Sequence, residues 1–210
     1  MRLEYQMTLD YLHHLLEAAP EGLALIEDAR EIRWEGGKIA LPLCLPLPDG
    51  GSLEAWVDSL PDRPPDHVVV LMRAGNASMG YWIEGELAAH KVIRKYMVRK
   101  KQGRMQIAYL STKGKSRAGS RVRLRESLEF FEEINQKLAD WIEEYGDPEA
   151  IFHSCPVRLK SHWFGSKIAP PFEPDDQRLV HVPFHVHQPV HEELLRIQRL
   201  LATGVLTIDE

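Results

Sequence analysis

The stretch from Lys91 to Arg125 constrains the fold of this chain more than any other part of the sequence. It holds 13 lysine and arginine residues and no aspartate or glutamate. The rest of the chain sets 13 basic residues against all 31 acidic ones, so a net charge of −5 conceals +13 here and −18 elsewhere. Such a segment repels itself unless it meets a polyanion. We expect phosphate backbone as its partner; the alternative is a solvated basic face without a partner.

Length and composition describe an ordinary globular chain. Its 210 residues, 44% of them hydrophobic, suit one large domain with a small addition. The sequence contains no apolar run of the length that a membrane span needs. The first 20 residues lack the features of a signal peptide. With only Cys44 and Cys155 available, no disulfide framework is indicated. We therefore expect a cytoplasmic protein that does not contact membranes.

The first 62 residues read as a separate α+β extension. An amphipathic pattern predicts a helix over residues 8–19, and short strands are expected at residues 31–34 and 38–45 around a glycine turn. A segment rich in proline and aspartate follows at residues 61–66. We place the domain boundary there, with an N-terminal extension at residues 1–62 and a second domain at residues 63–210.

Strand signals dominate the start of the second domain, and helix signals follow. A buried strand, two further strands, a long loop and then alternating helices and strands are expected. This order predicts an α/β fold with a mixed sheet flanked by helices, similar to ribonuclease-H-like folds. The expected strands cover residues 68–74, 80–87, 91–99, 150–155 and 179–187; the loop covers residues 100–119; the helices cover residues 124–145, 157–164 and 191–202.

Several segments resemble one known family. The third strand ends in VRKKQG at residues 98–103, with Gln106 three residues later, and a basic AGS segment at residues 118–120 precedes an arginine-rich helix start. Residues 182–184 (VPF) and 188–196 are similar to that family's last strand and helix. The chain is thereby identified as resembling the Vms-like release factor family in its compact bacterial form. That family is related to the catalytic domain of eukaryotic and archaeal class I release factors.

The resemblance implies release of nascent chains from peptidyl-tRNA on stalled large ribosomal subunits. It implies Gln106 as the catalytic residue, within a catalytic loop that includes Gln102, Gly103, Arg104 and Met105. A carboxamide donates and accepts hydrogen bonds at once, which suits it to hold a water or the terminal ribose for attack. No cofactor or metal is implied, and the free protein is expected to be a monomer. The expected contacts to tRNA and ribosomal RNA are Arg99, Lys100, Lys101, Lys113, Lys115, Arg117, Arg121 and Arg123.

Two features leave alternatives open. Relatives carry glycine followed by glycine or serine before the glutamine, where this chain has Arg104 and Met105 after Gly103. Glycine permits a close backbone approach to RNA, so a non-catalytic module that binds the ribosome or free tRNA is the alternative. The resemblance also fits two reactions: hydrolysis of the peptidyl ester, or cleavage of the tRNA near its 3′ end with a 2′-hydroxyl as nucleophile.

Two other site types were weighed. His181, His185 and His187 would share a face of the last strand, which could bind zinc, although no Cys-x-x-Cys or His-Glu-x-x-His spacing is present. Glu84 and Glu86 would alternate on the second strand, as in a two-metal nuclease, but no matching aspartate accompanies them. We favour a histidine-rich strand edge near RNA and no metal site.

Overall fold

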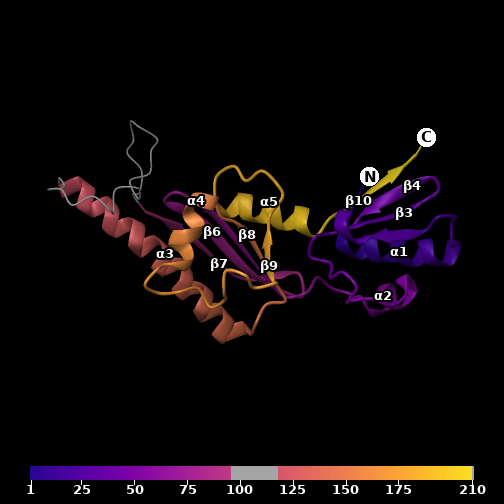
Figure 1. The fold of residues 1–210 in the computed structure, drawn as a ribbon, viewed down its shortest axis with the longest axis horizontal. Helices are drawn as coiled ribbons and strands as arrows, with labels where there is room; N and C mark the ends of the chain where they lie inside the picture. The colour runs from indigo at the N-terminus through magenta and orange to yellow at the C-terminus, as the bar shows by residue number, and fades with distance from the viewer. Residues whose placement is uncertain (96–117, 210) are drawn as a thin grey trace. The chain divides into compact units, whose positions relative to one another are not determined.

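The computed structural model describes residues 1–95 and 118–209, with the backbone alone at residues 118–124. The chain divides into two compact units (Figure 1). Unit 1 comprises Met1–Asp66, Ile83–Glu86 and Arg196–Glu210, and unit 2 comprises His67–Trp82 and Leu87–Leu195. Among the described residues, no helix is both long and apolar enough to cross a membrane.

Unit 1 is built on a five-stranded antiparallel sheet in the order β1-β10-β4-β3-β2. Two helices and a short 3₁₀ turn accompany the sheet. The elements are β1 (Arg2–Leu3), α1 (Tyr5–Ala18), β2 (Ala24–Ile26), η1 (Glu27–Ala29), β3 (Glu31–Trp34), β4 (Gly37–Ala40), α2 (Leu53–Ser59) and β10 (Gly204–Ile208).

Helix α1 supplies much of the core of unit 1. Its buried residues Leu9, Leu12 and Leu15 recur every three positions and form one apolar stripe. Gly204 in β10 lies so close to the helix that a Cβ atom there would be 2.6 Å from Oγ1 of Thr8. Glycine is therefore needed at Gly204 for the close approach of α1 to the sheet.

The C-terminal strand β10 was not expected from the sequence. It pairs with β1 on one side and with β4 on the other, so residues 196–210 cluster with the N-terminal residues. We had assigned these residues to the domain at 63–210. The difference arises because strand pairing between the two ends of a chain leaves no local signal in the sequence.

Arg30 holds the proline-rich segment of unit 1 in place. Its Nη2 donates to the carbonyl oxygens of Pro42 and Leu43, at 3.1 and 3.3 Å, and to that of Leu45. Burial lowers the pKa of the Arg30 guanidinium, and coulombic interaction with Cys44 opposes this. The expected strand at residues 38–45 accordingly ends at Ala40, because the prolines that follow cannot complete a ladder.

Unit 2 contains a five-stranded mixed sheet in the order β7-β6-β5-β8-β9. β5 pairs antiparallel with β6 and parallel with β8, and β8 pairs parallel with β9. This mixed α/β sheet agrees with the expected fold class. The elements are β5 (His67–Arg73), β6 (Asn76–Ile83), β7 (Glu86–Arg94), α3 (Ala118–Tyr145), β8 (Ala150–Ser154), α4 (Val157–Phe164), β9 (Leu179–His181) and α5 (His191–Leu201).

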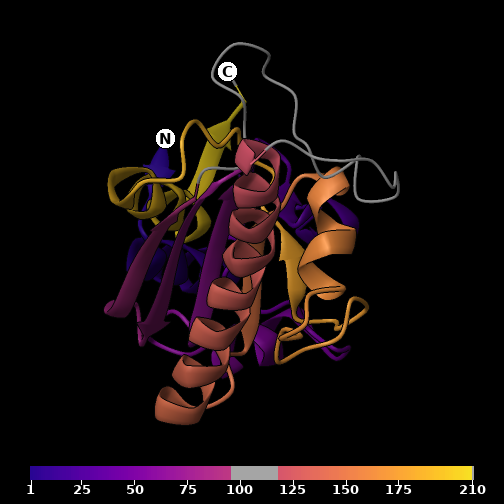
Figure 2. The same cartoon turned by 90° about the vertical axis from the view of Figure 1, so that its left-hand side faces the viewer.

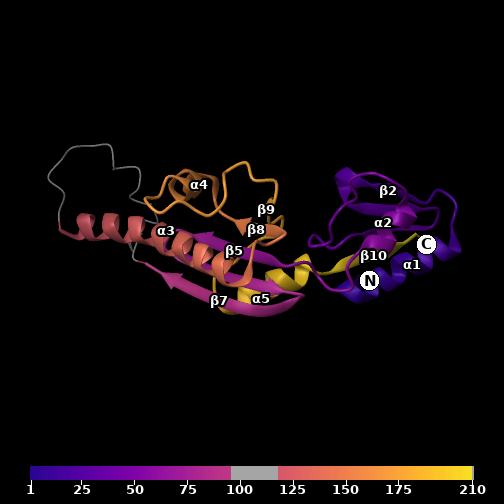
Figure 3. The ribbon, with the colours of Figure 1, turned by 90° about the horizontal axis from the view of Figure 1, so that it is seen from below.

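Helices cover both faces of this sheet (Figures 2 and 3). On one face, the Tyr81 hydroxyl donates to the carbonyl oxygen of Gly146, at the end of α3, at 2.9 Å. Gly80 points to the opposite face, where a Cβ atom would be 3.2 Å from Leu194 of α5. α4 lies beside α3, because the Trp163 indole N–H donates to Oδ1 of Asn135 at 2.7 Å. The sheet is therefore buried between α3 and α4 on one side and α5 on the other.

The first hairpins of unit 2 lie at different residues from those predicted. We expected a turn at residues 76–79 and a strand that begins at Gly80. Instead β5 turns at Gly75, with φ of 81°, and the next turn is at Glu84 and Gly85, with φ of 48° and 85°. Gly80 lies inside β6, and a Cβ atom added there would be 2.6 Å from the Trp82 ring. We interpreted a packing glycine as a turn glycine.

The last predicted strand is also shorter than expected. β9 ends at His181, whereas the sequence suggested a strand over residues 179–187. Pro183 cannot donate a ladder hydrogen bond, which explains an end at this point. Beyond it, Arg73 donates from Nη2 to the carbonyl oxygen of Val186 at 2.7 Å, and this bond attaches the irregular segment to the end of β5.

Candidate nucleic-acid interface

The basic segment leaves the sheet of unit 2 at the edge where its parallel strands end. β7 joins β6 through the tight Glu84–Gly85 turn and so runs in the same direction as β5, β8 and β9. After β7, the Lys95 N–H donates to the carbonyl oxygen of Gly75, which follows β5, at 2.8 Å. Ligand sites of open α/β sheets lie at such carboxyl ends.

Helix α3 contains the last residues of the basic segment, and its charges are arranged against its dipole. It begins at Ala118 and has no acidic residue in its first turn and no basic residue in its last turn. Helices are stabilised by the opposite arrangement, because the amino end carries partial positive charge. Arg121 and Arg123 lie in its first two turns. This end of the helix therefore favours an anionic ligand at a cost to the stability of the helix.

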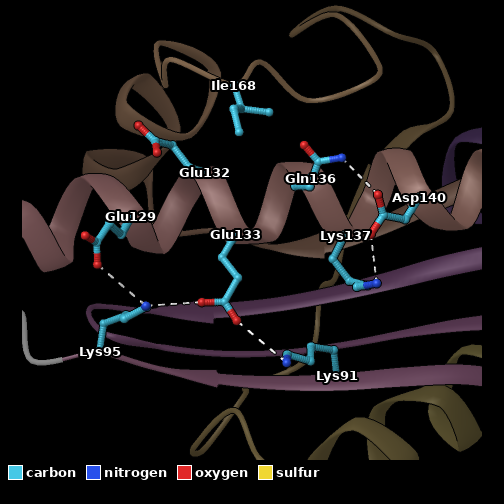
Figure 4. Close-up of a pocket in the computed structure, with 9 residues that line it drawn as sticks. All are labelled: Lys91, Lys95, Glu129, Glu132, Glu133, Gln136, Lys137, Asp140 and Ile168. Atoms are coloured by element: carbon cyan, nitrogen blue, oxygen red, sulfur yellow. Dashed lines mark hydrogen bonds and ion pairs between the residues drawn. The ribbon is translucent and has the colours of Figure 1, made fainter.

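Ion pairs join the first lysines of the basic segment, in and just after β7, to α3 (Figure 4). Nζ of Lys95 is 3.2 Å from Glu133 and 3.8 Å from Glu129, and Nζ of Lys91 is 3.7 Å from Glu133. These residues line a groove of about 380 Å³. Arg125 forms a further pair with Glu129 at 3.2 Å. Among the described side chains of the basic segment, Lys91, Lys95 and Arg125 therefore have carboxylate partners, and these acidic residues come just after the segment.

The pairing carboxylates are the residues that sequence reasoning missed. Glu129 and Glu133 lie one turn apart on α3, and Glu129 is one turn after Arg125. This i, i+4 spacing is visible in the sequence and predicts the Arg125 pair. Nothing in the sequence places Lys91 and Lys95 opposite the same helix, since that depends on how α3 lies on the sheet.

Most of the predicted site residues fall outside the described chain. These are Gln106 with the catalytic-loop residues Gln102, Gly103, Arg104 and Met105, and the predicted RNA contacts Arg99, Lys100, Lys101, Lys113, Lys115 and Arg117. The backbones of Arg121 and Arg123 are described, within α3. The structure thus fixes the two ends of the loop and leaves the predicted roles of these residues as predictions.

The histidines do not share a strand face as we had expected. His181 ends β9, and its ring contacts that of His153 at 5.5 Å, while His185 and His187 pair with each other at 4.9 Å beyond the strand. Burial, then the charges of His181 and Lys160, lowers the pKa of His153 to about 4. Its Nδ1 accepts from the Cys155 N–H at 3.3 Å, so the ring is a neutral core group. Within the described residues, no three His, Cys, Asp or Glu side chains gather as a metal site.

The pair of acidic residues considered for a nuclease is also separated. Glu84 lies in the turn between β6 and β7, with φ of 48°, and only Glu86 lies on a strand. The Glu84 carboxylate is 2.6 Å from Nη1 of Arg63. The expected alternation on one strand was wrong, because the strand boundaries are shifted.

One known protein family matches most of this chain. Residues 67–207 match the family described as Bacteroidetes VLRF1 release factor. The chain belongs to this family. Its members are release factors by that description, and the match covers unit 2 and most of β10. The resemblance suggested by the sequence is therefore confirmed.

Two curated relatives and one solved structure are similar to this chain. The mouse and human proteins named tRNA endonuclease ANKZF1 are 29% and 30% identical over 154 residues, which is 71% of this chain. The chain spans about a fifth of their length, 20% and 21%. A structure titled Vms1 mitochondrial localization core matches with a TM-score of 0.53 and 15% identity, over 98% of this chain and 85% of that one. It supports the fold alone.

Proposed function

We propose that this protein releases nascent chains from peptidyl-tRNA on stalled large ribosomal subunits, with unit 2 as its catalytic domain. The observation that carries the proposal is the match to a release factor family over unit 2. The same unit holds the basic segment at the carboxyl edge of its sheet. Peptidyl-tRNA and ribosomal RNA supply the polyanion that this segment requires.

Gln106 is the proposed catalytic residue. A carboxamide is a poor acid and a poor base, so its contribution would be to orient the attacking oxygen by donating and accepting hydrogen bonds. The developing charge would be stabilised by the RNA surroundings and by the cations beside the loop. Removing one such oriented group typically costs about two to three orders of magnitude in rate.

We propose that the bond cut is in the tRNA, close to its 3′ end. The name tRNA endonuclease carried by the mouse and human relatives supports this choice over ester hydrolysis. The 2′-oxygen of one nucleotide would attack the adjacent phosphorus and displace the 5′-oxygen of the next. The 2′-proton leaves, the 5′-oxygen takes up a proton, and a 2′,3′-cyclic phosphate remains on the shortened tRNA. The peptide departs with the terminal nucleotides.

The second candidate is a module that binds the ribosome without catalysis. It would be favoured by Arg104 and Met105, which stand before Gln106 where the resemblance leads us to expect glycine or serine. Side chains at these positions restrict the positive φ angles and close RNA approach that glycine allows. Unit 2 would then act as an anchor for another factor.

Two glutamines separate the candidates: Gln106 in the loop and the exposed Gln136 on α3. Gln106→Ala should slow loss of peptidyl-tRNA from stalled 50S complexes by about a hundredfold. Gln136→Ala, outside the loop, is the matched control and should retain most of the activity. Co-sedimentation with 50S subunits should be equal for both variants. Equal release by wild-type protein and Gln106→Ala would remove Gln106 from the mechanism, and binding without release by the wild type would favour the anchor.

A further inference from the structure

The chain around helix α4 forms a second basic segment, outside the predicted catalytic loop. Residues 150–172 contain Arg158, Lys160 and Lys167 and no aspartate or glutamate. Arg158 lies on α4, Lys167 follows it, and both are exposed. An acid-free stretch on an exposed helix again favours an anionic partner. This surface adjoins α3, whose first turns follow the basic loop.

A hollow lies between α3 and α4 beside these cations. Leu128 and Phe131 of α3 line one wall, and His162 and Ser166 line the other. Ser127 and Ser161 also line it, and its volume is about 70 Å³. Phe131 and His162 lie nearly parallel, with an interplanar angle of 29° and centroids 6.3 Å apart.

The lining combines apolar faces with an unused polar group. Leu128 is 50% exposed, whereas Phe131 beside it is buried, with 2% exposed. Oγ of Ser166 is buried and has no hydrogen-bond partner among the described residues. Proteins bind unstacked bases of single-stranded RNA on accessible aromatic rings with hydrogen-bonding groups nearby, and the half-buried His162 ring is the accessible one here.

We propose that this hollow receives one unstacked base of single-stranded RNA, whose backbone passes over α4. The inference rests on the proposed function, since it assigns a second contact to the same RNA. Pockets that enclose a drug-sized ligand measure roughly 300–1,000 Å³, so 70 Å³ accepts one ring edge and leaves sugar and phosphate outside. Leu128 is ten residues after Ala118, roughly 15 Å along the helix, a span that a few nucleotides cover.

The positive charges beside the hollow favour RNA over a protein as its partner. The phosphates beside the inserted base would meet Arg158 and Lys167, and the hollow's α4 side offers no carboxylate to repel them. On α3, Glu132 lies one turn beyond Leu128 and limits the approach of the strand from that side. The RNA strand would therefore run along α4 and not along the acidic remainder of α3.

Binding of the full-length protein to a nine-nucleotide single-stranded RNA, compared with a duplex of the same sequence, tests the proposal. Leu128→Ala with His162→Ala should weaken single-strand binding about fivefold or more, the range of one lost base stack. Binding to the duplex should not change, because its bases stay stacked. His162→Phe keeps an aromatic face and should restore binding when Leu128 is retained. Val157→Ala, exposed on α4 but outside the hollow, is the matched control.

The outcomes separate this inference from the proposed function. Equal losses on single-stranded and duplex RNA would mean that the pair of residues acts through fold or charge, and no loss would mean that the hollow takes no base; both overturn the proposal. A loss with Val157→Ala as large as with the hollow variants also overturns it. Failure of release by wild-type protein, with the single-strand preference intact, would remove the proposed function and leave the base site standing.

Discussion

The two compact units of this chain use their charged residues in opposite ways. Unit 1 carries 17 acidic and seven basic residues, a net charge of −10, whereas unit 2 carries 14 acidic and 19 basic ones, a net charge of +5. The overall charge of −5 describes neither unit. Attraction to a polyanion is therefore expected of unit 2, and unit 1 would repel a phosphate backbone at most of its surface.

The basic residues of unit 1 serve its own structure. Arg33 and Lys38 both pair with Glu31 at 2.8 Å, and the two contacts lower the pKa of that carboxyl, Lys38 contributing most. Arg30 is held by three backbone carbonyl groups. In unit 2, by contrast, most basic residues lie in one segment, and among its described side chains Lys91, Lys95 and Arg125 have carboxylate partners. The concentration of cations in one segment, and not their number alone, distinguishes unit 2 from unit 1.

The largest expected effect is on the salt dependence of 50S binding. Replacing Lys100, Lys101, Lys113 and Lys115 together by glutamine should lower the log–log salt slope by about four, close to one per phosphate contact. Binding at moderate salt should fall by at least two orders of magnitude. Replacing Arg33 and Lys38 of unit 1 should leave the slope unchanged. Equal effects from the two sets, measured by co-sedimentation across a salt series, would contradict the division between the units.

Arg30 should matter for stability and not for RNA. Arg30→Met removes three hydrogen bonds and leaves the carbonyl oxygens of Pro42, Leu43 and Leu45 without that donor. We expect a loss of about 2–4 kcal/mol in the free energy of unfolding, measured in urea. Arg33→Gln, whose pair is exposed, should cost under about 1 kcal/mol. Reduced ribosome binding by folded Arg30→Met protein would show that this cation also contacts RNA.

His153 should make unit 2 less stable at acid pH. Its pKa is lowered to about 4 in the fold and is near 6.5 in the unfolded chain. At pH values between these two pKa values, the unfolded state binds a proton that the native state does not bind. The free energy of unfolding therefore decreases as pH falls from about 6.5 to 4. Between pH 7 and 5 the expected loss is about 2 kcal/mol. His153→Asn keeps an acceptor for the Cys155 N–H and should flatten this part of the urea-unfolding profile; an unchanged slope would refute the assignment.

The smallest expected effect concerns the pairs at the base of the loop. Glu133→Gln removes the carboxylate shared by Lys91 and Lys95, both partly exposed. Stability should fall by less than about 1 kcal/mol. RNA binding should strengthen slightly and its salt slope should steepen by up to about one, because a lysine becomes available to phosphate. Glu143→Gln, farther along the same helix, is the matched control, and weaker binding by Glu133→Gln would show that the pairs shape the loop.

Local patterns predicted local structure well. α4 matches the expected helix at residues 157–164, β3 matches the strand at 31–34, and α5 ends one residue before expected. Failures came from long-range causes: β10 pairs across the whole chain, and Gly80 packs under Trp82 in place of a turn. The basic segment could be identified as a candidate site from its charge. That Glu133 pairs with Lys95 could not, because the pair depends on how α3 packs against the sheet.

The decisive experiment treats stalled 50S–peptidyl-tRNA complexes with this protein and resolves the freed tRNA at single-nucleotide resolution. We expect loss of peptidyl-tRNA that depends on Gln106, with a tRNA shortened at its 3′ end and closed by a cyclic phosphate. Full-length tRNA would place the cut at the ester. Peptidyl-tRNA that persists at every protein concentration, with the protein bound to the subunit, would contradict release by this chain.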